Sequence, residues 1–175
     1  MFSVSRLLEG PGGAQPTVDR PIDHLVACHS RIEERLQTIE RAVANLEEKP
    51  QAAREALAAV FRYFESSGAM HTEDEERSVF PRIEQRLAPD ERRYIADLER
   101  QHREAEELYE QLKEVPPAGA GAALYQDLAA RFCELYRSHI ASENDRFVAI
   151  AGRLLNEGDL AEISREMRAR RGWLR

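Results

Sequence analysis

Three His-x3-Glu pairs are the residues of this sequence whose types and spacing could do chemistry. They are His71 with Glu75, His102 with Glu106, and His139 with Glu143. Residues four positions apart lie on the same face of an α-helix, so each pair presents an imidazole and a carboxylate in one direction. Iron, manganese and zinc accept both kinds of ligand in proteins. Together with a single histidine nearer the N-terminus, His29, the pairs indicate a metal site.

The histidines lie in segments whose apolar residues recur at steps of three and four, the period of an amphipathic α-helix. Prolines and glycines mark turns between these segments, at Pro50, at Pro89 and over residues 116–121. We therefore predict four helices, which run over about residues 21–48, 51–87, 89–114 and 122–155. Within the second helix, the Ser-Ser-Gly stretch at 66–68 predicts a kink or a bulge.

The turns place the four histidines at one height if successive helices are antiparallel, as short connections require. His29 and His71 are equally far from residue 50, and His71 and His102 are centred near Pro89. His102 and His139 are centred in the glycine-rich loop at 116–121. The sequence thus predicts an all-α, antiparallel up-down-up-down four-helix bundle with one layer of inward histidines. Glu75 and Glu143 lie one turn along on the same faces.

A layer of this composition indicates cations. Buried carboxylates without a partner cost several kcal/mol, so an interior cluster is tolerable mainly when positive charge compensates it. Four imidazoles and at least two carboxylates exceed the four ligands of a tetrahedral zinc site. They suit two five- or six-coordinate ions of the iron or manganese type, with the carboxylates able to bridge. A structural polar layer that binds zinc or no metal is the alternative.

The ordered set of motifs resembles the hemerythrin-like, or HHE cation-binding, family, in its bacterial single-domain form, over about residues 21–156. The neighbouring residues resemble it as well, at 27–33, 74–76 and 80–81. The resemblance implies a di-iron centre with one iron on His29 and His71 and the other on His102 and His139. It also implies that Glu75 and Glu143 bridge the irons, with an oxo, hydroxo or water ligand completing the bridge. Manganese or zinc are the other metals to consider.

The sequence departs from the oxygen-carrying hemerythrins, in which the third helix supplies His-x3-His. Glu106 stands at the second of these positions, and we keep it as a further candidate ligand. The acid of the fourth helix is Glu143 rather than an aspartate one residue later. A more anionic shell favours ferric iron, so we expect binding or sensing of oxygen, peroxide or nitric oxide, or iron handling under oxidative or nitrosative stress, rather than oxygen transport. A di-iron enzyme that consumes peroxide or delivers iron for repair is the alternative, and we assign no catalytic side chain.

Several other polar residues have less defined roles. We expect His24 to miss the histidine layer and to be solvated or to cap a helix, Glu99 to be at most a spare ligand, and Tyr136 either to line the pocket or to pack in the core. Most of the neighbouring acids, Glu73, Asp74 and Glu76, should face solvent. So should the basic residues near the C-terminus, Arg168, Arg170 and Arg171.

Charge and composition limit the class of partner. A formal charge of −7 argues against nucleic acid and anionic membranes. The sequence contains no apolar run of about 18 residues and no export signal. Its two cysteines, Cys28 and Cys133, are too few for a disulfide framework, which favours a reducing cytoplasm. We expect a sensor to need a separate signalling partner, because no appended signalling domain is apparent, and the oligomeric state is open.

A chain of 175 residues suits one well-buried domain. We divide it into an N-terminal arm (1–20), the bundle (21–156) and a short C-terminal helix with its tail (157–175), in which Asp159 is the expected helix cap.

Overall fold

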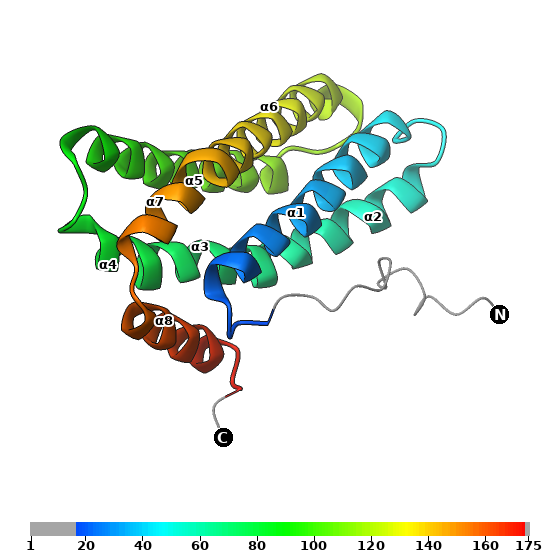
Figure 1. Ribbon diagram of the computed structural model, residues 1–175. Coiled ribbons are helices and arrows are strands. Elements are labelled where there is room, and N and C mark those ends of the chain that lie inside the picture. Colours follow the sequence, from blue (N-terminus) through cyan, green and yellow to red (C-terminus); the bar gives the residue numbers. More distant parts are fainter. Residues whose placement is uncertain (1–16, 174–175) are drawn as a thin grey trace.

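The computed structural model describes residues 17–173, which form helices and connecting turns without any strand in that range. Four long helical stretches make an antiparallel bundle, as predicted, and a further helix lies across one end (Figure 1). The first stretch is α1 (Pro21–Ala44) and the third is α5 (Pro89–Glu114). The second contains α2 (Pro50–Tyr63), η2 (Phe64–Gly68), α3 (Ala69–Asp74), η3 (Glu75–Val79) and α4 (Phe80–Glu84). The fourth contains η4 (Gly119–Gly121), α6 (Ala122–Ser142), η5 (Glu143–Phe147) and α7 (Val148–Leu154), and the helix at the end is α8 (Glu157–Arg170).

Prolines begin three of the long stretches, at Pro21, Pro50 and Pro89. Proline suits the first turn of a helix, where its missing N–H has no intrahelical partner to lose. The first helix ends about one turn earlier than predicted, because the side chain of Asn45 donates to the Arg41 carbonyl at 2.8 Å and ends the regular helix. Residues 1–16 of the predicted arm lie outside the described residues, whereas Val18 is buried in the bundle end.

Three π-helical turns interrupt the second and fourth stretches. The first, Phe64–Gly68, covers the Ser-Ser-Gly stretch and confirms the bulge predicted there. The second and third were not predicted, and each begins at a candidate carboxylate ligand, Glu75 in η3 and Glu143 in η5. A π-turn inserts one residue into the helix, so it changes the direction of the side chains that follow. The turn in η3 also ends two residues before Pro81, which has no N–H to donate to the preceding turn.

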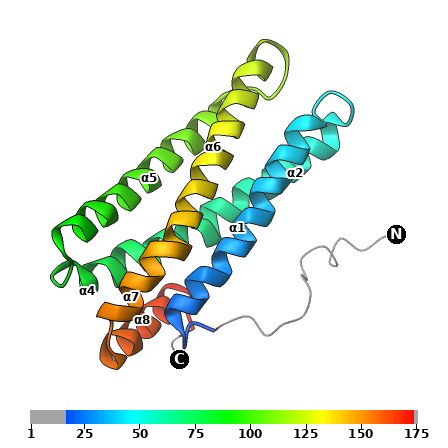
Figure 2. The same ribbon diagram turned by 45° about the horizontal axis from the view of Figure 1, so that its top comes forward.

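Two apolar clusters fill the bundle, one toward each end. The upper cluster, at the end of the bundle where α1 turns into α2, includes Ile32, Leu36 and Phe132. The lower cluster, at the end that α8 covers, includes Leu25, Phe80 and Phe147. Along the four long stretches, His29, His71, His102 and His139 each lie between the residues of one cluster and those of the other. The bundle's long axis and the pairing of its helices are plain in Figure 2. A polar layer therefore crosses an otherwise apolar core.

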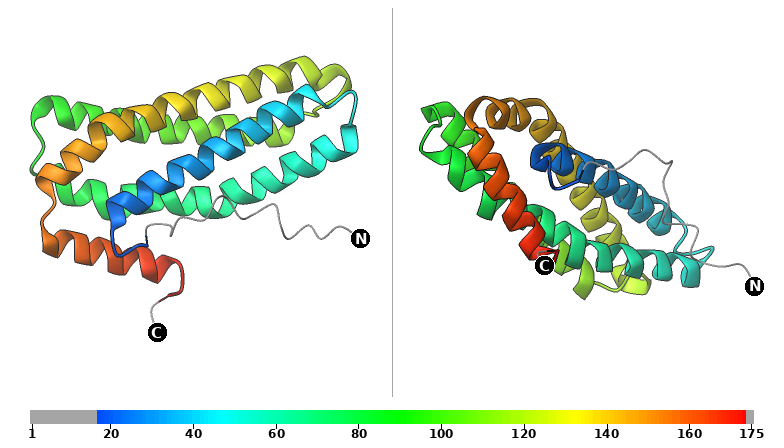
Figure 3. Two further views of the ribbon diagram at one scale, coloured as in Figure 1. Left: turned by 45° about the vertical axis from the view of Figure 1, so that its right-hand side comes forward. Right: turned by 60° about the horizontal axis from the view of Figure 1, so that its bottom comes forward.

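Helix α8 packs against the lower end of the bundle, beside α1 and α3 (Figure 3). Ile163 and Met167 are fully buried in the lower cluster. Its cap is Asn156 rather than the predicted Asp159: the Asn156 side chain accepts from the Asp159 backbone N–H at 2.9 Å, and the Asp159 carboxylate accepts from the Asn156 backbone N–H at 3.0 Å. Within the described part of the chain, no helix is both long and apolar enough to cross a bilayer.

The expectation of solvated charges is wrong for Asp74, Arg170 and Arg171, whereas the side chains of Glu73 and Arg168 are more than a third exposed. Asp74 is completely buried, and it forms ion pairs with Arg170 and Arg171 of the chain's C-terminal end. Glu76 is half-buried. The error has a physical reason, because opposite charges far apart in the sequence can bury each other once the helices pack, and a short run of charges does not reveal its partner.

Candidate metal centre

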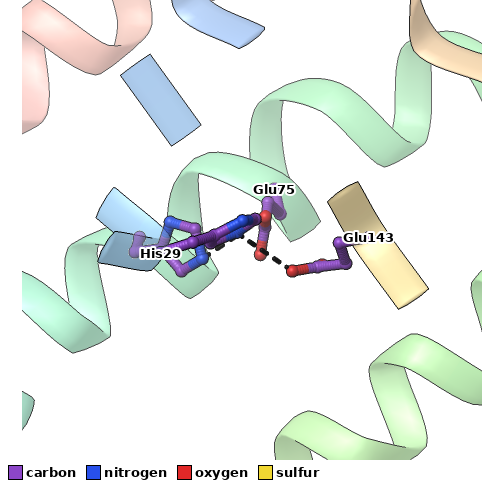
Figure 4. Close-up of side chains that lie close together, drawn as sticks. His29, Glu75 and Glu143 are labelled. Carbon is purple, nitrogen blue, oxygen red and sulfur yellow. Dashed lines mark ion pairs between the residues drawn. The ribbon is translucent and has the colours of Figure 1, made fainter. Parts of the chain in front are cut away.

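The six residues predicted as principal ligands all lie in the polar layer. His29 comes from α1, His71 from α3, His102 from α5 and His139 from α6. Glu75 and Glu143 are the first residues of η3 and η5. All six side chains are buried, and the two glutamates have no exposed surface. Figure 4 shows His29, Glu75 and Glu143 pointing toward one another from different helices.

These side chains form two groups that share both carboxylates. One ligand atom from each of four residues lies within 4.8 Å of the others in a first group, which consists of His29, His71, Glu75 and Glu143. The same holds for a second group, which consists of Glu75, His102, His139 and Glu143. The arrangement therefore offers two adjacent positions for cations, each with two imidazoles and two carboxylates.

Each glutamate directs one oxygen toward each group. Glu143 places Oε2 3.2 Å from Nε2 of His29 and Oε1 3.2 Å from Nε2 of His139. Glu75 places Oε1 3.5 Å from Nε2 of His71 and Oε2 3.5 Å from Nε2 of His102. The two oxygens of each glutamate therefore face imidazole nitrogens that belong to the two different groups.

Hydrogen bonds on the outer side of three histidines fix which nitrogen faces the centre. Nδ1 of His29 lies 2.8 Å from Oδ1 of Asn144, Nδ1 of His102 lies 2.8 Å from Oε1 of Glu76, and Nδ1 of His139 lies 2.9 Å from Oε1 of Gln101. Since these oxygens are acceptors, each Nδ1–H donates, and the neutral imidazole keeps its lone pair on Nε2.

The inward nitrogens then oppose one another. Nε2 of His102 and Nε2 of His139 are 3.0 Å apart, and neutral rings oriented by their outer hydrogen bonds would bring two lone pairs together there. A cation between the rings, or a proton on one of them, removes this repulsion. The donor set therefore fits a metal ion at this position.

Unpartnered buried atoms point to the same conclusion. In the described part of the chain, the buried side-chain atoms without a hydrogen-bond partner are Nε2 of His29, Nδ1 of His71 and all four oxygens of Glu75 and Glu143. Leaving a buried polar group unsatisfied costs about 1–3 kcal/mol, and more for a charged one. All six atoms belong to residues of the two groups, and a pair of cations would compensate the four carboxylate oxygens and Nε2 of His29 where they lie.

Protons occupy part of the cluster when no metal is bound. Burial and the charge of Glu143 raise the pKa of Glu75 to about 8. Burial opposes ionisation of Glu143 too, but the imidazoles of His139 and His29, whose Nε2 atoms lie 3.2 Å from its oxygens, outweigh it and hold the pKa of Glu143 below its usual value. For His102, burial is outweighed by Glu75 and Glu76, which raise its pKa to about 10. A metal must displace these protons, so its affinity falls as the pH falls.

The remaining candidates lie outside the two groups. Glu106, the further candidate ligand, is exposed, and Glu99 is partly exposed. His24 also misses the layer but is buried, with Nε2 3.4 Å from Nη2 of Arg171, so the solvated role expected for it is wrong. Tyr136 is half-buried, and its ring centroid lies 6.5 Å from that of His139.

Sequence reasoning missed the three residues that orient the histidines. Glu76, Gln101 and Asn144 are each adjacent in sequence to a candidate ligand, yet each binds a histidine on another helix. Neighbours of a ligand point away from the ligand's face and toward the next helix. Their position next to a ligand in the sequence was the available signal that they could orient a histidine. Only the packing of the helices shows which histidine each one reaches.

Glu76 provides a test of this outer layer. Glu76→Gln should weaken metal binding at the His102 position by about 10–100-fold, because a neutral amide polarises the imidazole less than a carboxylate does. An anaerobic titration with ferrous iron measures the change. Glu73→Gln is the matched control, since Glu73 belongs to the same acidic run but pairs with Arg77 rather than with a ligand. Equal weakening in the two variants would contradict the role of Glu76.

A cavity of about 430 Å³ extends to the second group, between η2 and α3 on one side and α5 and α6 on the other. His102, Phe64, Phe132 and Tyr136 line it. Four acids and one arginine also line it: Glu65, Glu73, Glu106, Glu110 and Arg77. Small molecules thus have space beside His102.

Two comparisons with known proteins bear on the centre. The sequence model of the hemerythrin HHE cation binding domain matches residues 20–151, a range that contains all four histidines and both shared glutamates. The chain is also similar to an uncharacterized protein from Haemophilus influenzae. The two are 30% identical over 161 residues, which cover 89% of this chain and 92% of the relative.

Proposed function

This chain belongs to the hemerythrin HHE cation binding domain family, and we propose that it is a non-haem di-iron protein that binds a small molecule at its iron centre. One observation carries the proposal: Glu75 and Glu143 each direct one oxygen to each of the two groups of histidines. Shared carboxylates of this kind hold two metal ions side by side, whereas a single tetrahedral zinc ion would use only four of the six residues.

In the proposed centre, His29 and His71 hold one iron, and His102 and His139 hold the other. Glu75 and Glu143 would be shared by the two ions, and an oxo, hydroxo or water ligand would complete the bridge. Two imidazoles and two carboxylate oxygens give each iron four protein ligands, which leaves room in a five- or six-coordinate shell. Bound iron supplies redox chemistry and an open coordination position. Manganese and zinc are the competing metals.

The cavity beside His102 supports a small neutral ligand. Its acidic lining repels anions, whereas oxygen, hydrogen peroxide and nitric oxide carry no charge that would exclude them. We propose that the protein reacts with or senses one of these molecules, or handles iron under oxidative or nitrosative stress, rather than transporting oxygen. A sensor would signal through a separate partner protein. Two free, buried thiols, Cys28 and Cys133, agree with a reducing cytoplasmic location.

Blocking the cavity tests this assignment. Ala69 lines the cavity and is exposed, so Ala69→Trp can fill the space without disturbing the core. The variant should keep its metal content but react several-fold more slowly with hydrogen peroxide or nitric oxide in the diferrous state, as stopped-flow absorbance would measure. Ala59→Trp, at an exposed position on α2 that does not line the cavity, should react at the unmodified rate. Equal rates in both variants would contradict entry through this cavity.

Steady-state turnover separates a binding protein from an enzyme. A peroxide-consuming enzyme, the alternative function, would complete many cycles per chain, whereas a binder or sensor would react once per reduced centre.

A further inference from the structure

Helix α8 supplies no candidate ligand and lies beyond the residues that the family model matches, yet its C-terminal end reaches the segment that carries Glu75. Asp74, the last residue of α3, has no exposed surface. Its Oδ1 accepts from Nε of Arg170 at 2.8 Å and from Nη1 of Arg171 at 3.3 Å, and its Oδ2 accepts from Nη2 of Arg171 at 2.6 Å. Arg170 also donates to the Ser78 hydroxyl in η3.

The ion pairs between Asp74 and the two arginines are costly to break in the folded protein. A buried carboxylate that loses its partner is strongly destabilising, because the uncompensated charge remains in a medium of low dielectric constant. Both oxygens of Asp74 are in use, and Arg171 engages them in the bidentate fashion that fixes geometry as well as charge. Asp74 is therefore held to the end of α8.

Helix α8 is itself fixed by other contacts. Ile163 and Met167 are buried in the lower cluster. Arg86, just after α4, donates to Asp159 at 2.6 Å and to the Leu154 carbonyl at 2.6 Å. Because α8 is fixed to the rest of the bundle, its ion pairs with Asp74 also fix the position of Asp74.

The residue that follows Asp74 is the shared carboxylate Glu75, with which η3 begins. Neither oxygen of Glu75 has a hydrogen-bond partner, and the imidazole nitrogens of His71 and His102 that face them are 3.5 Å away. The location of this carboxylate depends on where its own backbone lies. That backbone is fixed by the adjacent Asp74 on one side and by the π-helical turn, with Ser78 held by Arg170, on the other.

We infer that Asp74, together with Arg170 and Arg171, positions Glu75 between the two metal ions, so that α8 is part of the metal centre without supplying a ligand. The inference rests on the proposed di-iron function. It makes Asp74 a positioning residue: its loss should disturb paired metal binding more than it disturbs the fold.

Cobalt(II) binding to the full chain tests the inference, because cobalt content counts the occupied positions and the visible spectrum reports their coordination geometry. The variant is the double substitution Arg170→Gln/Arg171→Gln. Its affinity for the pair of cobalt ions should fall by about 10–100-fold, the range seen when groups that orient ligands are removed, and its spectrum should change. Arg165→Gln is the matched control, since Arg165 is an exposed arginine of the same helix that pairs with Glu162 rather than with Asp74. It should keep the affinity and spectrum of the unmodified protein.

Far-UV circular dichroism and thermal unfolding of the metal-free proteins show whether each variant is folded at the titration temperature. If the double variant does not fold, Asp74→Asn replaces it, because asparagine keeps the shape of the side chain and removes its charge. Unmodified affinity and spectrum in the folded variant would overturn the inference, and so would an equal loss in Arg165→Gln. If the unmodified protein itself binds fewer than two cobalt ions, the di-iron proposal fails, and this inference fails with it.

Discussion

Replacing Glu75 or Glu143 by alanine is expected to abolish paired metal binding and to reduce the metal content from two ions per chain to one or fewer. Each of these carboxylates has one oxygen facing each group of histidines, so either substitution removes a ligand from both positions at once. The histidines differ in this respect, because each belongs to a single group. Elemental analysis after anaerobic loading with ferrous iron and removal of free metal measures the loss.

Glu106→Ala is the matched control for these two variants. Glu106 was a candidate ligand in the sequence, but it is exposed and lies outside both groups. The control should retain two metal ions per chain. Equal loss of metal in all three variants would mean that the shared carboxylates have been assigned wrongly, and so would full retention in Glu75→Ala.

Removing the metal is expected to lower the stability of the native protein substantially. A ligand that binds only the folded state at 100 times its dissociation constant stabilises it by about 2.7 kcal/mol per site. Two such sites give ~5 kcal/mol, which corresponds to roughly 10–20 °C in the melting temperature of a domain of this size. The physical reason lies in the centre itself, where metal ions would partner the buried oxygens of Glu75 and Glu143 that protons compensate only in part.

Thermal unfolding followed by circular dichroism, with the metal-loaded protein compared with the chelated protein, measures this difference. The Glu75→Ala variant should respond much less to the chelator, because it has no pair of ions to lose. A melting temperature of the loaded unmodified protein that does not change on chelation would contradict the expected coupling of metal binding to folding.

The histidine layer could be predicted from the sequence because two simple regularities determine it. Helical periodicity places His29, His71, His102 and His139 on inward faces, and short turns make the helices antiparallel. Together they fix both the direction and the height of each side chain, and the structure brings the four histidines and both glutamates together. That these six residues bind metal stays a prediction, which the variants above test.

Other features depend on interactions that a local pattern does not encode. The π-turns at Glu75 and Glu143 add one residue to a helix, a change too small to be seen in apolar periodicity. The burial of Asp74 depends on arginines about a hundred residues later, and a carboxylate in an acidic run has the same local signature whether it faces water or a guanidinium. Glu76 was misjudged for the same reason, since its partner His102 is on another helix.

Metal stoichiometry combined with the absorption spectrum tests the di-iron centre most directly. The protein would be loaded with ferrous iron without air, freed of unbound metal, analysed for iron per chain and then exposed to air. The arrangement of Glu75 and Glu143 between two pairs of histidines predicts two irons per chain and new oxo-to-iron absorption bands in the near ultraviolet. Less than one metal per chain, or tightly held zinc without such bands, would contradict it and would make the polar layer a structural one.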